Sequence, residues 1–194
     1  MSIRPMTGLE PGAGGLAGLT CRDPARRLVP AEVLVRQCRV DAYRGSGPGG
    51  QHRNKTSSAI RVTHTPTGII ATGTEMRSQM QNRNHALARL RRKLAIELRL
   101  PVDLSAFVRP GWLDEIPGAA DLSIRAGNER FDEVLAIVLD VLEGAAASVS
   151  AAAMALGVNT AAVVAFLAAD PGVWQKIAAM RKAAGLRPLG NPRK

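Results

Sequence analysis

The residues with the clearest capacity for chemistry are Gly49, Gly50 and Gln51, because residues 45–51 contain four glycines and one proline and cannot form regular structure. Two adjacent glycines open backbone torsions closed to other residues and let the main chain approach a crowded partner. The N–H of Gln51 could then point at an oxyanion or a leaving oxygen, and such a donor is worth about 10²–10³ in rate. The Gln51 side chain both donates and accepts hydrogen bonds, so it could orient a water molecule without acting as a strong base.

The sequence offers this tripeptide no acid, base or metal of its own. No Ser-His-Asp or Cys-His pairing suggests itself, and His52, His64 and His85 are too far apart in sequence to indicate a shared metal site. Cys21 and Cys38 occur without a secretory context and indicate no disulfide framework. We therefore expect no metal and no cofactor, and a catalytic role would need a partner that completes the site. Taken alone, the tripeptide favours an ordinary flexible hairpin loop.

Charge is divided into blocks along the chain, whose formal net charge is +10. Residues 36–99 hold 13 Lys and Arg against 3 Asp and Glu, residues 100–170 hold 3 against 10, and residues 171–194 hold 6 against none. A concentrated basic block is typical of a nucleic-acid-binding surface. The alternative is an Arg-rich surface that serves only solubility.

The elements that must position the loop are short and alternate in hydrophobicity. Ile60 and Val62 should face one way and Arg61 and Thr63 the other, which is typical of a half-buried strand. In order, we expect a helix over 31–37, a strand over 38–43, the loop 44–51, a helical turn over 52–57, a strand over 59–64, a tight turn over 65–68 and a returning strand over 69–72.

A long helix should follow, beginning at Ser78 and running to about Arg99. Ser78 at the N-cap and Gln81 at the third helical position fit a capping box. One stripe should pack on the sheet, and it consists of Leu87, Leu90, Leu94 and Leu98. The charges away from that stripe indicate either a solvated face or contacts with phosphate, and they are Arg83, Arg89, Arg92, Lys93 and Arg99.

The rest of the chain divides by composition into a Gly-rich flexible lead, a linker or wrapped irregular segment in which Trp112 is a packing anchor, a helical module and a basic tail. Their ranges, in that order, are 1–27, 101–127, 128–185 and 186–194. Within the module we expect helices from an Asn128 cap to Gly144, over 150–156, over 160–169 and over 171–184. Residues 153–167 suggest a helix-turn-helix, but residues 161–167 offer no side chain that reads bases. No run approaches the ~18 apolar residues of a membrane span, and no secretory signal is evident.

The stretch from Tyr43 to Thr56, YRGSGPGGQHRNKT, closely resembles the catalytic loop of class I peptide-chain release factors. Residues 58–64, the turn 66–69, residues 75–79, Asn82 and Ala86-Leu87 continue the match in order, so the similarity covers about residues 38–98.

This resemblance implies an α+β fold, a small domain over residues 28–100 with a mixed sheet and a long C-terminal helix. The all-α segment expected after it follows from the periodicity of residues 128–184 and is a departure from the family. The resemblance also implies that Gly49, Gly50 and Gln51 enter the peptidyl-transferase centre of the large ribosomal subunit. There the Gln51 N–H would stabilise the transition state of peptidyl-tRNA hydrolysis, while its side chain positions water. Ribosomal RNA and the tRNA 2′-hydroxyl would complete the site, and a methyltransferase would be a partner acting on Gln51. The residues expected to contact ribosomal RNA are Arg44, His52, Arg53, Asn54, Lys55, Arg61, Arg77 and Arg83.

The chain departs from full-length release factors in what flanks this domain. Only about 37 residues precede the first strand, too few for a codon-reading domain, so we expect a cytoplasmic, codon-independent factor of ribosome rescue or quality control, with an organellar matrix as the alternative location. The tail is basic but sparse, which argues against sensing of the mRNA channel. Two other functions stay open: a non-catalytic ribosome- or RNA-binding protein using the same basic face, and a transcriptional regulator built on residues 128–184.

Overall fold

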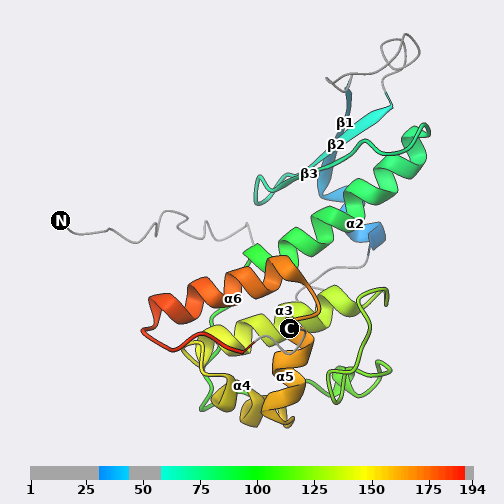
Figure 1. The fold of residues 1–194 in the computed structure, drawn as a ribbon. Coiled ribbons are helices and arrows are strands. Elements are labelled where there is room, and N and C mark those ends of the chain that lie inside the picture. Colours follow the sequence, from blue (N-terminus) through cyan, green and yellow to red (C-terminus); the bar gives the residue numbers. More distant parts are fainter. Residues whose placement is uncertain (1–30, 44–57, 191–194) are drawn as a thin grey trace, which may run out of the picture. The chain divides into compact units, whose positions relative to one another are not determined.

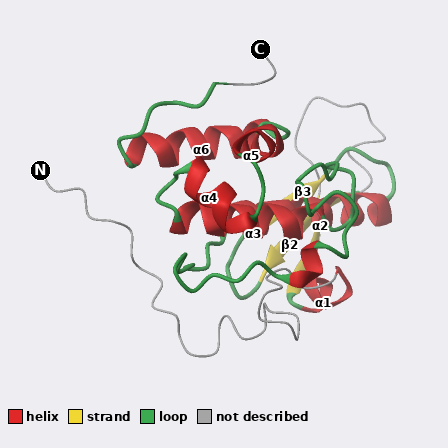
Figure 2. Cartoon of the chain, turned by 90° about the horizontal axis from the view of Figure 1, so that it is seen from below, coloured by secondary structure: helices red, strands yellow, loops and turns green. Residues whose placement is uncertain are grey.

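The structure is a computed structural model that describes residues 31–43 and 58–190, and the chain divides between Lys93 and Leu94 into two compact units (Figure 1). The first unit contains α1 (Ala31–Arg36), β1 (Cys38–Tyr43), β2 (Ala59–His64) and β3 (Ile70–Gly73), and α2 (Gln79–Glu97) begins in it. The second contains a 3₁₀ turn (Gly111–Leu113), α3 (Phe131–Gly144), α4 (Val149–Leu156), α5 (Thr160–Leu167) and α6 (Pro171–Ala183). The α+β class expected from the sequence is confirmed, with strands described only in the first unit (Figure 2).

The sheet has three strands in the order β1-β2-β3, and both pairs are antiparallel. The expectation of a mixed sheet is therefore wrong for the described strands. The reason is local: β2 returns directly into β3 through a turn in which Gly68 takes a φ of 71° and donates its N–H to the carbonyl oxygen of His64 at 2.8 Å. A tight turn of this kind can join only antiparallel neighbours.

The alternation expected in β2 is confirmed, since Ile60 and Val62 are buried while Arg61 is exposed. The leucine stripe expected in α2 is correct at its centre, where Leu90 and Leu94 are buried, and wrong at Leu87 and Leu98, which are only half-buried. The buried row instead follows i, i+4 spacing through residues 82, 86, 90 and 94. Its N-terminal members are Asn82 and Ala86, and the helix backbone at Asn82 lies so close to Gly73 of β3 that no side chain fits at that glycine.

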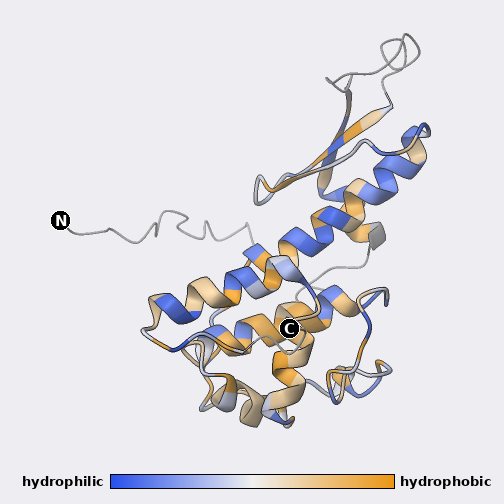
Figure 3. Ribbon diagram, viewed as in Figure 1, coloured by the Kyte–Doolittle hydropathy of each residue, from blue (hydrophilic) through white to orange (hydrophobic). Residues whose placement is uncertain are grey.

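The second unit has an apolar centre to which α3, a largely hydrophobic helix (Figure 3), contributes most. Its residues Val134, Val138, Leu139 and Leu142 are all buried. Residues 101–127 carry little regular structure but contribute buried side chains to this unit, which favours wrapped irregular structure over a linker. These are Trp112, Leu113, Ile116, Ala119, Leu122 and Ile124. Trp112 is a packing anchor, as expected.

Three of the helices in this unit begin at a side-chain cap. Ser148 accepts a hydrogen bond from the N–H of Ala151, Asn159 from that of Ala162, and Asp170 from those of Gly172 and Val173. The expected cap at Asn128 is wrong: α3 begins at Phe131 after Arg130, and Asn128 Oδ1 accepts the N–H of Arg130 at 2.9 Å instead.

The helix-turn-helix suggested by the sequence has a geometric counterpart, because α4 and α5 are bent by 106° around Gly157, within the range of that motif. The residues that α5 exposes are Thr160, Ala161 and Ala165. None of these three exposed side chains carries the amide or guanidinium that base reading requires, so the structure gives no support to sequence-specific DNA binding.

No single helix among the described residues is long and apolar enough to cross a membrane; only α4 and α5 taken together, across their bend, reach the necessary length and composition.

Candidate functional site

Most of the residues expected to act lie outside the described parts of the chain. These are Gly49, Gly50 and Gln51, together with Arg44, His52, Arg53, Asn54 and Lys55. The structure does describe the two residues that flank this segment, Tyr43 and Ser58, and the three remaining expected RNA contacts, Arg61, Arg77 and Arg83. The structure therefore shows the part of the domain to which this segment is attached.

The base of the segment is the paired end of β1 and β2. Tyr43 is the register partner of Ala59, so residues 44–57 leave and rejoin the same end of the sheet. The guanidinium carbon of Arg61 lies 5.0 Å from the centre of the Tyr43 ring, within the range of a cation–π contact. Arg61 nevertheless stays exposed, so its charge is available at the strand that carries the segment.

The three expected RNA contacts that the structure describes, Arg61, Arg77 and Arg83, are all exposed. Within the described ranges 31–43 and 58–190, none of them has a carboxylate within ion-pair distance. By contrast, Arg39 is engaged with Asp41 at 3.0 Å. Exposed guanidinium groups that are not neutralised by the protein itself are suited to phosphate.

Other cations of α2 hold the first unit together. Arg89 donates to the carbonyl oxygen of Thr72 at 2.8 Å and to Glu75 Oε1 at 2.7 Å, and Lys93 donates to the carbonyl oxygen of Ile70 at 2.8 Å. The hydrogen bond from Arg89 and, to a lesser extent, hydrogen bonds from backbone N–H groups lower the pKa of Glu75 from 4.5 to about 2. Arg89 and Lys93 are thus tied to β3 and the connection after it, rather than being purely solvated charges.

Arg99 belongs to the second unit and is not a solvated or phosphate-contacting residue. Its Nη1 donates to Asp140 Oδ1 at 3.0 Å, and the same oxygen accepts the N–H of Leu100 at 3.1 Å. The Asp140 side chain is 2% exposed, so this carboxylate needs these donors to be tolerated inside the unit. Sequence reasoning missed Asp140, although an acid within the apolar run Val138 to Leu142 was the available signal.

His64 is buried and hydrogen-bonded at both ring nitrogens. Its Nδ1 lies 2.7 Å from Thr67 Oγ1 and its Nε2 lies 3.4 Å from Gln37 Oε1. Burial lowers the pKa of the imidazole. These contacts brace the β2–β3 turn, and within the described residues no group of three His, Cys, Asp or Glu could hold a metal ion.

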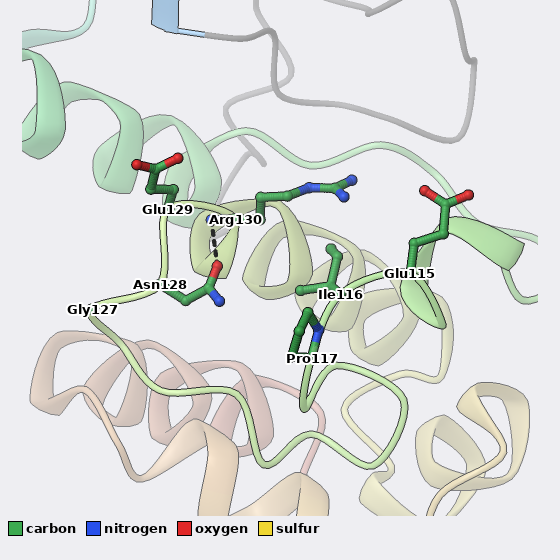
Figure 4. A pocket seen from close by; sticks show the side chains of 7 residues that line it. All are labelled: Glu115, Ile116, Pro117, Gly127, Asn128, Glu129 and Arg130. Carbon is green, nitrogen blue, oxygen red and sulfur yellow. Dashed lines mark hydrogen bonds between the residues drawn. The ribbon is translucent and has the colours of Figure 1, made fainter.

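A pocket of about 400 Å³ lies in the second unit, lined by residues 115–117 and 127–130 (Figure 4). The guanidinium of Arg130 lies over the Trp112 ring at 5.6 Å and its Nε donates to Glu133 at 3.1 Å. None of the expected site residues lines this pocket. Its lining includes two exposed carboxylates, Glu115 and Glu129, and one guanidinium, Arg130.

Comparison with known proteins identifies the family to which residues 29–102 are similar. Residues 29–102 match the family described as "RF-1 domain". The chain is 53% identical to peptide chain release factor 2 of Lactiplantibacillus plantarum over 66 residues, which is 34% of this chain and 18% of that protein. It is 47% identical to peptide chain release factor 1 of Leptospira biflexa over 75 residues, 39% of this chain and 21% of that protein. With peptide chain release factor 1 of Ureaplasma parvum, identity is 53% over 71 residues, 37% and 20% of the two chains.

Residues 29–102 are therefore a domain of the class I peptide-chain release factor family. The chain spans only about a fifth of the length of these relatives.

Proposed function

We propose that this protein hydrolyses the ester bond of peptidyl-tRNA in the peptidyl-transferase centre of the large ribosomal subunit, with Gly49, Gly50 and Gln51 as its catalytic tip. The observation that carries this proposal is the position of the tripeptide inside residues 29–102, the part of the chain that matches release factors by family and by identity.

In this mechanism the main-chain N–H of Gln51 donates to the oxygen on which charge develops as the ester bond breaks. The glycines keep side chains away from the reacting groups, and the Gln51 amide orients the attacking water. Groups of the ribosome and the tRNA supply what the protein lacks, so activity exists only in the assembled complex. Methylation of Gln51 by a methyltransferase belongs to the same proposal.

Contacts with ribosomal RNA orient the domain. Three of the proposed contacts, Arg61, Arg77 and Arg83, are exposed, which supports a phosphate-binding role. The remaining proposed contacts lie in the segment between Tyr43 and Ser58.

The finer part of the proposal is that this polypeptide acts without reading a codon, in ribosome rescue or quality control. Its support is that the match to each release factor covers 18–21% of that relative, and that the residues after the family match lie in a second compact unit of helices.

The test is peptide release measured side by side on non-stop ribosomes, on large subunits carrying peptidyl-tRNA, and on ribosomes halted at a stop codon. We expect release from one of the first two substrates, a loss of at least about 10²-fold in Gly50→Ala, whose added Cβ would displace the Gln51 N–H, and a smaller loss in Gln51→Ala, which keeps that N–H but lacks the amide that orients water. Full release by both variants would refute the assignment of the tip. Wild type that binds ribosomes but releases nothing would favour the non-catalytic RNA-binding alternative, and release restricted to the stop codon would refute codon independence.

A further inference from the structure

Asn82 is a buried amide in the first turn of α2 that joins three separate stretches of the first unit. Its side chain is 0% exposed, its Oδ1 accepts the N–H of Met76 at 2.8 Å, and its Nδ2 donates to the carbonyl oxygens of Met76 at 2.8 Å and Ser58 at 2.7 Å. Three of the four hydrogen bonds that an amide can make are therefore formed inside the protein.

The backbone of Asn82 is held as firmly as its side chain. Its N–H donates to the carbonyl oxygen of Ser78 at 3.0 Å. A Cβ added at Gly73 would lie 2.0 Å from the Asn82 carbonyl oxygen, so the end of β3 touches the first turn of α2 where no side chain fits. Asn82 therefore has a fixed position from which its amide reaches Ser58.

Ser58 is the residue at which the chain re-enters the described structure after residues 44–57, and it immediately precedes the start of β2. The opposite end of that segment, Tyr43, is fixed by its pairing with Ala59. Strand pairing thus fixes one end, and the Asn82 amide fixes the carbonyl at the other.

We propose that Asn82 is a positioning residue for peptidyl-tRNA hydrolysis: by holding the Ser58 carbonyl against α2, it sets where the segment that carries Gly49, Gly50 and Gln51 joins the domain. This inference rests on the proposed function. An apolar side chain would fill the space but would leave the N–H of Met76 and the carbonyl oxygens of Met76 and Ser58 without these hydrogen bonds, so the amide is needed to join the three stretches. The amide serves a geometric purpose, and a misplacement of about 1 Å at a reacting group can cost about 10²-fold in rate.

The test compares Asn82→Ser with Asn84→Ser, a matched change at an exposed asparagine two positions further along α2. Single-round release is measured against ribosome concentration at a temperature where circular dichroism shows each variant folded. For Asn82→Ser we expect the maximal rate to fall by about 10²-fold while the half-saturating concentration stays within about twofold. Asn84→Ser should match wild type in both quantities.

A second perturbation reaches the same contact from the other side. Gly73→Ala should displace the first turn of α2 and lower the maximal rate, whereas Gly127→Ala, at a glycine with open space around it, should not. The double variant Gly73→Ala with Asn82→Ser should lose less than the product of the single losses, because both act through one contact. Asn82→Asp keeps the size of the side chain and the acceptor for Met76 but removes both donors, so it stands in if Asn82→Ser does not fold.

The outcomes separate the two proposals. If wild type releases no peptide, the proposed function fails. If wild type is active and folded Asn82→Ser or Asn82→Asp reaches the wild-type maximal rate, with only a lower melting temperature, Asn82 is structural and this inference alone is overturned. Failure of both variants to fold under any assay condition would likewise assign Asn82 to folding and overturn the positioning role.

Discussion

At the scale of single residues, the basic side chains of the first unit have two distinct uses that composition does not separate. Arg83 is exposed, whereas Arg89, six positions further along α2, is bound to the carbonyl of Thr72 and to Glu75. One is available to an external phosphate and the other is part of the fold. Substitution of either removes one positive charge, so the pair offers a clean comparison.

We expect Arg89→Ala to return the pKa of Glu75 from about 2 toward 4.5, because the Arg89 hydrogen bond is the largest cause of the shift. Since the folded pKa is the lower one, whatever Glu75 contributes to stability is present above pH 4.5 and is lost as the pH falls toward 2. Carboxyl chemical shifts followed through an acid titration measure this directly. Arg83→Ala is the control and should leave Glu75 unchanged; a Glu75 that titrates near 4.5 in wild type would contradict the contact.

At the scale of elements, helix starts in the second unit depend on individual side chains. Asp170 Oδ1 accepts the N–H groups of Gly172 and Val173 at 2.8 and 3.1 Å, and Pro171 occupies a position where a missing N–H costs nothing. α6 has few buried residues to hold it, Val173 and Ile177. The stability of α6 should therefore depend strongly on its cap, whereas α3 is held mainly by its many buried residues.

We expect Asp170→Ala to lower the free energy of unfolding by about 0.5–2 kcal/mol, the usual cost of losing an N-cap. Urea denaturation followed by circular dichroism measures the change. Glu129→Ala removes an exposed carboxylate that caps no helix and should cost at most about 0.5 kcal/mol. Equal losses in the two variants would show that charge, and not capping, is responsible.

Features of the fold that depend on neighbouring residues in the sequence could be predicted, whereas contacts between residues far apart in the sequence could not. The strands Cys38–Tyr43 and Ala59–His64 appear at the expected residues, since alternation and turn residues are local signals. The Asn82–Ser58 and Arg99–Asp140 contacts join residues that are 24 and 41 positions apart in the sequence. No local pattern around these residues indicates which residue each one contacts. Of the expected site, three exposed arginines can be located on the described structure, while the roles of the tripeptide stay predictions.

At the scale of the whole molecule, the proposed binding to ribosomal RNA should be strongly salt-dependent, because the first unit carries exposed cations and RNA is a polyanion. We expect affinity to fall steeply between about 50 and 200 mM salt. Arg61→Ala, Arg77→Ala and Arg83→Ala should each weaken binding and reduce the slope of log affinity against log salt by about 1. Titrations at several salt concentrations provide the measurement.

Arg109→Ala is the matched control, since this guanidinium already pairs with Asp114 at 2.9 Å in the second unit. Its slope should equal that of wild type. An unchanged slope in all three first-unit variants would remove these arginines from the RNA-contacting set.

The exposed arginines of the first unit have a kinetic consequence. Charges of one sign gathered on one folded unit attract a polyanion before any contact forms and raise the rate of encounter. Loss of Arg61, Arg77 or Arg83 should therefore slow association more than it speeds dissociation.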